Sequence, residues 1–179
     1  AVAHAVLGQI DAATTEQALF EAAIPNVPKQ RYMHTVRCQD ILAVGREMLA
    51  GELLYRTGDF DRAFAHLRQA VVLEDALPYD EPWGWMQPGR HALGALLLEQ
   101  GHIEEAATAY RADLGLDQTV IRSNQHPNNV WALQGLHMCY QKMGETRLAA
   151  MIKPALDIAQ GRADQAVQSS CFCAGQTAE

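Results

Sequence analysis

A segment that recurs every 43 residues constrains the fold of this chain more than any other feature. Three stretches align without gaps: Gly58-Asp59-Phe60-Asp61-Arg62-Ala63, Gly101-His102-Ile103-Glu104-Glu105-Ala106 and Gly144-Glu145-Thr146-Arg147-Leu148-Ala149. The same offset relates Ala50, Leu93 and Leu136. Equal spacing of this kind indicates a stack of similar units, because each unit buries its apolar face mainly against its neighbours.

The residues around each repeated glycine predict two helices joined by a short turn. In the second unit, leucines at helical spacing share one stripe of a helix expected over residues 91–100. Gly101 stands where a helix ends with positive φ, and a second helix is expected over residues 103–114. Ala106 is small enough to let the two helices approach closely. In the third unit, Pro154 is expected to kink or shorten the second helix.

These units resemble the tetratricopeptide repeat. The residues that match are the small residue of the first helix (Gly51, Gly94), the apolar residue three positions later (Leu54, Leu97, Tyr140), the turn glycine, the alanine five positions after it, and a later apolar residue (Leu67, Tyr110). The third unit departs from the pattern, since His137 replaces the small residue and Lys153 the apolar one. The family unit has about 34 residues, so each unit here carries about nine more.

The resemblance implies an all-α fold, a tetratricopeptide-like α-solenoid of antiparallel helix pairs with a 43-residue period and long loops between repeats. Residues 1–179 are expected to form a single domain, made up of a partial repeat (1–24), three repeats (38–76, 88–117 and 130–160), and a short capping helix with a cysteine-containing tail (161–179). The partial repeat begins just before Gly8. We therefore expect either a longer array upstream or self-association through an open N-terminal face.

Three further motifs resemble a narrower group of microbial and fungal tetratricopeptide-repeat proteins. They are Tyr79-x-Glu81-Pro82-x-x-Trp85-x-x-Pro88, His126-Pro127-Asn128-Asn129-x-Trp131-x-Leu133 and the ending Ser169-Ser170-Cys171-Phe172-Cys173. Members tend to be longer at the N-terminus. The resemblance implies a fold and brings no assigned activity.

The family binds ligands on a concave face lined by the first helices. The residues expected there are Met48, Glu52, Tyr55, Arg56, His91, Glu99, Trp131, Gln134, Met138 and Lys142. The cations that clamp a terminal carboxylate in chaperone-binding members are missing from the matching positions. A mixed groove suits an extended peptide or a helix, unless the tail of the chain fills part of it.

The residues added to each repeat fall in loops over 25–37, 77–88 and 117–129, which are expected to lie along one edge of the solenoid. Aromatic residues and a histidine in these loops define a candidate loop edge: Tyr79, Trp83, Trp85 and His126. The tryptophans either cover local core or line a ligand site.

The pair Cys171-x-Cys173 is the most unusual local feature. Two thiolates at this spacing can bind one soft metal ion if His91 or His126 completes the site. The alternatives are a redox role, or small buried side chains that pin the tail, which is expected to include a short helix over residues 162–168. No other cofactor is expected.

Charge and motifs narrow the class of function. The chain carries 14 Lys and Arg against 21 Asp and Glu, a net charge of −7. We therefore expect no nucleic-acid or membrane partner, because both need clustered cations. No phosphate-binding loop, nucleophile elbow or zinc-protease motif is present. The sequence thus favours a scaffold that binds a protein or peptide, in a reducing compartment such as the cytoplasm, over an enzyme. A metal-binding or redox accessory protein is the alternative.

Overall fold

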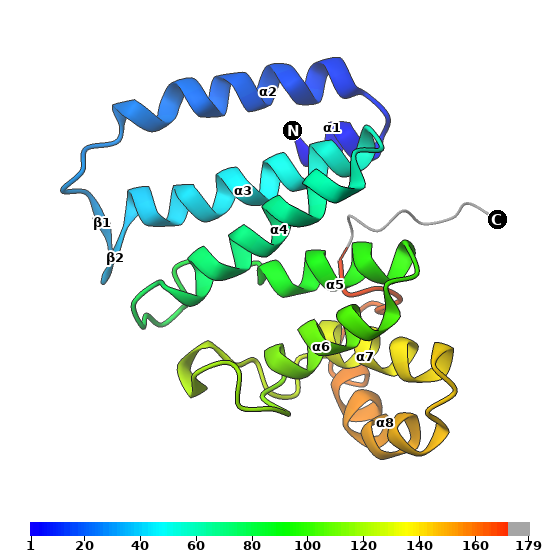
Figure 1. Cartoon of the computed structure of the whole chain (residues 1–179). Coiled ribbons are helices and arrows are strands. Elements are labelled where there is room, and N and C mark those ends of the chain that lie inside the picture. The colour runs from blue at the N-terminus through cyan, green and yellow to red at the C-terminus, as the bar shows by residue number, and fades with distance from the viewer. Residues whose placement is uncertain (172–179) are drawn as a thin grey trace. The chain divides into compact units, whose positions relative to one another are not determined.

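The computed structural model describes residues 1–171 of the chain, and these residues are almost entirely helical (Figure 1). The described residues contain eight α-helices, two 3-10 turns and one short β-hairpin. This confirms the all-α expectation. The chain divides into two compact units, residues 1–89 and residues 90–179. The expected single domain over 1–179 stays a prediction.

Unit 1 contains two pairs of helices joined by a hairpin. Its elements are α1 (Val2–Val6), α2 (Ile10–Ala23), η1 (Ile24–Asn26), β1 (Tyr32–Met33), β2 (Val36–Arg37), α3 (Cys38–Arg56) and α4 (Phe60–Asp75). The methyl groups of Ala5 and Ala13 are buried with Leu53, so α1 and α2 pack on α3 through small side chains. Tyr55 on α3 makes edge-on ring contacts with Phe60 and Phe64 on α4.

Unit 2 contains two further helix pairs. Its elements are α5 (Gly89–Glu99), which begins at the boundary, then α6 (Ile103–Asp113), η2 (Arg122–Asn124), α7 (Val130–Lys142) and α8 (Thr146–Gln160). Tyr110 is completely buried and forms the centre of this unit's core, together with Leu96, Leu97, Leu136 and Cys139.

The repeated glycines have the backbone conformation that the sequence predicts. Gly8, Gly58, Gly101 and Gly144 all have φ between 73° and 85°. In each case the amide of the residue after the glycine donates to a carbonyl of the preceding helix, as Asp59 does to Leu54 and His102 to Leu97. Only glycine adopts this conformation without a steric penalty, which explains why it recurs at each turn.

Small and large residues of paired helices interlock at the repeated positions. A Cβ atom on Gly51 of α3 would lie 2.7 Å from Leu67 of α4, and one on Gly94 of α5 would lie 2.5 Å from Tyr110 of α6. Both the glycines and their large partners are 43 residues apart. The helices of the pairs α3/α4 and α5/α6 are therefore held close by the same arrangement, once in each unit.

The last part of the chain departs from the expected structure. Pro154 lies within α8, which continues past it to Gln160, so the proline does not shorten the helix, and the alternative of a kink stays a prediction. The capping helix expected over residues 162–168 is absent, since residues 161–171 form turns and bends. A helix of seven residues gains too little from its own hydrogen bonds to form alone. This segment is held instead by Gln160, whose side-chain amide donates to the carbonyl of Val167.

Candidate binding surface

Four residues expected on the concave face are core residues. Met48, Glu52, Tyr55 and His91 are all buried. Arg56 is half-buried, and its guanidinium lies 5.3 Å from the centre of the Tyr55 ring. A buried side chain cannot contact a partner unless the fold rearranges, so the expected position on an open face is corrected for these four.

The other expected concave-face residues all lie in unit 2 and are more accessible. Trp131, Gln134 and Met138 on α7 are half-buried, and Glu99 and Lys142 are exposed at the ends of α5 and α7. The amide of Gln160 at the end of α8 donates to Gln134 at 3.0 Å. Gln134 is thus hydrogen-bonded to the end of α8, where the turns that lead to the tail begin.

The loop edge separates into buried and exposed members. His126 is buried, while Tyr79 and Trp83 are exposed. The Trp85 ring packs on α3, because a Cβ on Gly45 would lie 3.2 Å from its Cη2 atom and 3.7 Å from the ring of Phe20. Trp85 is therefore half-buried against α3, whereas Tyr79 and Trp83 are exposed.

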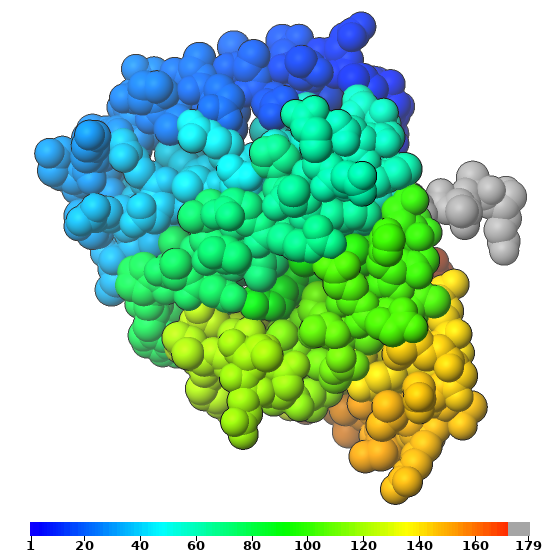
Figure 2. All heavy atoms as spheres, viewed as in Figure 1, coloured from blue at the N-terminus to red at the C-terminus, as the bar shows by residue number. Residues whose placement is uncertain are grey.

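The exposed loop residues lie beside the β-hairpin, which the sequence did not predict. The Thr35 hydroxyl of the hairpin donates to the carbonyl of Tyr79 at 2.7 Å. A Cβ on Gly84 would lie 2.9 Å from Val36, so the loop backbone presses directly on the buried valine of β2. In the space-filling view the hairpin and the loop lie next to each other (Figure 2).

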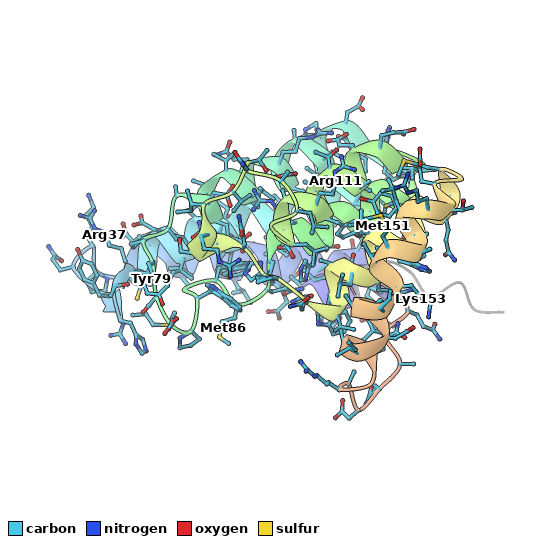
Figure 3. The ribbon with its side chains drawn as sticks, turned by 90° about the horizontal axis from the view of Figure 1, so that it is seen from below. Arg37, Tyr79, Met86, Arg111, Met151 and Lys153 are labelled. Carbon is cyan, nitrogen blue, oxygen red and sulfur yellow. The ribbon has the colours of Figure 1, made fainter. Side chains whose placement is uncertain are left out.

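Large side chains project from both segments and define a hairpin–loop surface. Its apolar members are Tyr32, Met33, Tyr79, Trp83 and Met86, with exposed fractions from 42% to 68%. Its cations are Lys29, Arg31 and Arg37, which are also exposed. Arg37, Tyr79 and Met86 lie toward the same end of unit 1 in Figure 3.

The hairpin brings together cations that look scattered in the sequence. Tyr32 pairs with Arg37 across the two strands, and the amide of Cys38 donates to the Arg31 carbonyl. The Arg37 guanidinium donates to the Tyr32 hydroxyl at 3.2 Å. That hydrogen bond and the charge of Asp40 raise the pKa of Arg37. The side chain of Arg37 is therefore held in place and fully charged.

The facing loop contains two carboxylates, of which Glu81 is exposed and Asp80 is buried. The Tyr79 hydroxyl donates a short hydrogen bond to Glu81, which raises the pKa of Tyr79. Asp80 is 7% exposed, and one of its oxygens accepts from the amide of Glu81. The cations of the hairpin are thus only partly balanced by the neighbouring acidic groups.

Two buried polar atoms of the same loop have no hydrogen-bond partner among the described residues. They are Oδ2 of Asp80 and Nε1 of Trp85. A buried polar group without a partner costs about 1–3 kcal/mol. Native proteins keep few such groups, and those that remain call for an explanation such as a functional site. These two atoms therefore cost the loop free energy, and the packing of the loop on α3 does not explain why they are kept.

Unit 2 contains a buried polar cluster that links a histidine of α5 and a histidine of the third loop through one carboxylate. Nε2 of His91 lies 2.9 Å from Asp113, and Nδ1 of His126 lies 2.8 Å from the other carboxylate oxygen. Burial alone would raise the pKa of Asp113, but the hydrogen bonds from His126 and His91 outweigh it, so this pKa is lowered. The Ser170 hydroxyl donates to the His91 carbonyl and lies 2.5 Å from the Tyr110 hydroxyl. The cluster thus connects α5, α6, the third loop and the tail.

Only one of the two cysteines expected to form the tail site lies within the described residues. Cys171 is buried and disulfide-bonded, and Cys173 lies outside the described residues. No group of three or more potential metal ligands occurs in residues 1–171. Burial raises the pKa of the free Cys139 thiol to about 12, which keeps it protonated. The soft-metal and redox alternatives stay predictions.

The comparisons with known proteins add no family to this geometry. No family model and no curated protein matches the chain. Across residues 1–171, every helix is too short or too polar to cross a bilayer.

Proposed function

We propose that this chain is a helical-repeat module of the tetratricopeptide type, and that it binds a peptide segment of a protein partner on the hairpin–loop surface. The fold part of the proposal is supported by the turn glycines with positive φ and by the two interlocked pairs, Gly51 with Leu67 and Gly94 with Tyr110. Each feature recurs at the spacing of the repeat.

The observation that carries the binding part is the composition of the exposed surface. Tyrosine, tryptophan, methionine and arginine are enriched in protein interfaces and dominate their binding energy. All four residue types are present on the hairpin–loop surface, where two tyrosines, two methionines and one tryptophan are substantially exposed. Single exposed apolar residues need no explanation, but a cluster of them marks an interaction site.

A peptide-display selection on the immobilised full chain tests this proposal. We expect the selection to enrich peptides whose binding weakens by at least about tenfold when Tyr79 and Met86 are both changed to Ala, because truncating central apolar contacts costs more than 1 kcal/mol each. The matched control is Met151→Ala on α8, since Met151 is 67% exposed and Met86 is 68% exposed. The control should leave binding within about twofold, the size expected for a residue outside an interface.

Two results would count against the proposal. One is a selection that enriches no peptide. The other is a set of enriched peptides that lose as much affinity with Met151→Ala as with the double change at Tyr79 and Met86, because binding would then not depend on the hairpin–loop surface. Far-UV circular dichroism of each variant confirms that the helices remain folded.

A further inference from the structure

The charge of the hairpin–loop surface distinguishes it from the rest of the chain. Residues 22–39 contain Lys29, Arg31 and Arg37 and no Asp or Glu, whereas the whole chain has a net charge of −7. Within residues 1–171, none of these three cations forms an ion pair. The hairpin therefore presents unpaired positive charge on a chain that is otherwise acidic.

The nearby acidic groups offset this charge only in part. Glu81 is exposed and accepts a hydrogen bond from Tyr79, whereas Asp80 is nearly fully buried. Asp40, in the first turn of α3, interacts electrostatically with Arg37. Lys29 and Arg31 are exposed and form no ion pair among the described residues.

We propose that the occupant of the hairpin–loop surface is an acidic peptide segment whose Asp or Glu residues flank aromatic or aliphatic side chains. The acidic side chains meet Lys29, Arg31 and Arg37, and the apolar side chains pack on Tyr79, Trp83 and Met86. The inference rests on the proposed function and names the chemical class of its partner.

Complementary charge guides such a peptide to one place on the chain. An acidic peptide is repelled by the net negative charge of the chain and attracted by the cations of the hairpin, which raises the rate of productive encounters. Exposed tyrosine, methionine and tryptophan then supply the apolar contacts that retain the peptide, which charge alone does not provide.

A single-stranded nucleic acid is the other polymer that combines negative charge with flat rings. Proteins that bind one usually neutralise about six to ten phosphates, and this surface offers three cations on a chain of net charge −7. The observations therefore favour the peptide, and a nucleic acid becomes an outcome of the test.

The test measures fluorescence anisotropy with two defined probes on the full chain. One probe is a fluorescein-labelled dodecapeptide of alternating Glu and Phe or Leu residues, and the other has Lys in place of every Glu. We expect the Glu probe to bind at least about tenfold more tightly than the Lys probe, and to weaken as the salt concentration rises from 0.05 to 0.5 M. A fluorescein-labelled oligothymidylate of similar length is measured in parallel.

Charge reversal on the chain supplies the matched variants. The double change Lys29→Glu and Arg31→Glu should weaken the Glu probe by about tenfold, because it replaces two attractions with two repulsions. The control double change, Arg147→Glu and Arg162→Glu, alters the net charge equally at exposed positions of unit 2 and should change the affinity by less than about threefold. The hairpin should survive the test change, because the contacts of Arg31 within it are made by its backbone.

Four results would overturn the inference. They are equal binding of the two peptide probes, no measurable binding of either one, equal effects of the two double changes, and oligothymidylate binding tighter than the Glu probe. If peptides from the display selection depend on Tyr79 and Met86 but not on Lys29 and Arg31, the acidic partner is wrong while the binding surface stands. If those peptides do not depend on Tyr79 and Met86 either, the proposed function fails as well.

Discussion

The substitution Gly135→Ala tests how the core of unit 2 is built. The Tyr110 ring of α6 is completely buried between two glycines, Gly94 on α5 and Gly135 on α7. A Cβ on Gly135 would lie well under 3.0 Å from three ring atoms of Tyr110. The ring cannot move away from α7, because on its other side it already lies as close as a glycine on α5 permits.

The expected loss of stability follows from two opposing effects. Overpacking a well-packed core costs about 1–3 kcal/mol, whereas replacing a helical glycine with alanine gains about 0.5–1 kcal/mol. The net loss should therefore be about 1–2 kcal/mol, which for a chain of this size lowers the melting temperature by about 2–8 °C. Urea unfolding followed by far-UV circular dichroism measures the change.

A double-mutant cycle identifies the cause of that loss. Tyr110→Leu removes the ring that clashes, so Gly135→Ala should cost at least about 1 kcal/mol less in the leucine background than in the natural one. The hydrogen bond between Tyr110 and Ser170 is absent from both leucine variants and cancels in the cycle. Additive effects, or a Gly135→Ala variant as stable as the natural chain, would refute the view that this glycine is required by the tyrosine.

Three further predictions concern the repeat and the buried polar cluster. Gly101→Ala should cost about 1–2 kcal/mol from backbone strain alone, because nothing lies within 4 Å of the added Cβ; Gly101→Asn should lower the urea midpoint less, and a neutral alanine would contradict the left-handed turn. Ser170→Ala should cost about 1–3 kcal/mol of stability, since it leaves the buried hydroxyl of Tyr110 without its partner. If Ser170 anchors the tail, trypsin should cleave this variant at the exposed Arg162 faster than it cleaves the natural chain. The pKa of Asp113 is lowered in the folded chain, so its carboxylate stabilises the fold above its ordinary pKa of 3.8, and this contribution is lost as the pH falls through the folded-state pKa. Urea midpoints measured over a series of pH values should therefore decline less in acid for Asp113→Asn than for the natural chain. The same decline in both would refute this prediction.

The helices and their turns could be predicted because their signals are local. The helix pair of the second repeat was expected over residues 91–100 and 103–114. The corresponding helices α5 and α6 span Gly89–Glu99 and Ile103–Asp113. The turn at Gly101 depends only on the conformational freedom of one residue and the hydrogen bonds beside it. A local rule of this kind can be read from a single sequence without knowledge of the neighbouring units.

The candidate surface could be predicted only in part. Tyr79 and Trp83 were named as loop-edge residues, but the hairpin that lies beside them was missed. Its turn has His34 at a φ of 55°, and the turn residues do not include the glycine or asparagine that usually marks a tight hairpin. The available signal was the cationic and aromatic segment from Lys29 to Arg37, and only strand pairing shows that its charges lie together.

The buried cluster of unit 2 shows a different limit of sequence analysis. His91 and His126 were considered as metal ligands, and their association with Asp113 was not predicted. Their association depends on which side chains of α5, α6 and the third loop converge, and sequence spacing does not determine that. Since both carboxylate oxygens of Asp113 accept from the histidines, the geometry favours a structural link over a metal site.

The last helix pair, α7 and α8, shows that the repeat determines backbone geometry more strictly than packing. Gly144 has the same positive φ as the earlier turn glycines, yet His137 and Lys153 stand where the pairs α3/α4 and α5/α6 have a glycine and its large partner. Lys153 is exposed and pairs with Asp157. The glycine that does contact a large residue in this region, Gly135, lies two positions earlier and packs against Tyr110 of the preceding pair. The turn recurs because it needs only one glycine. The packing of a glycine against a large side chain needs matching residues on two helices. It follows that a shared repeat does not imply a shared binding face in this chain, and that the position of a partner has to be argued from the exposed side chains of each unit.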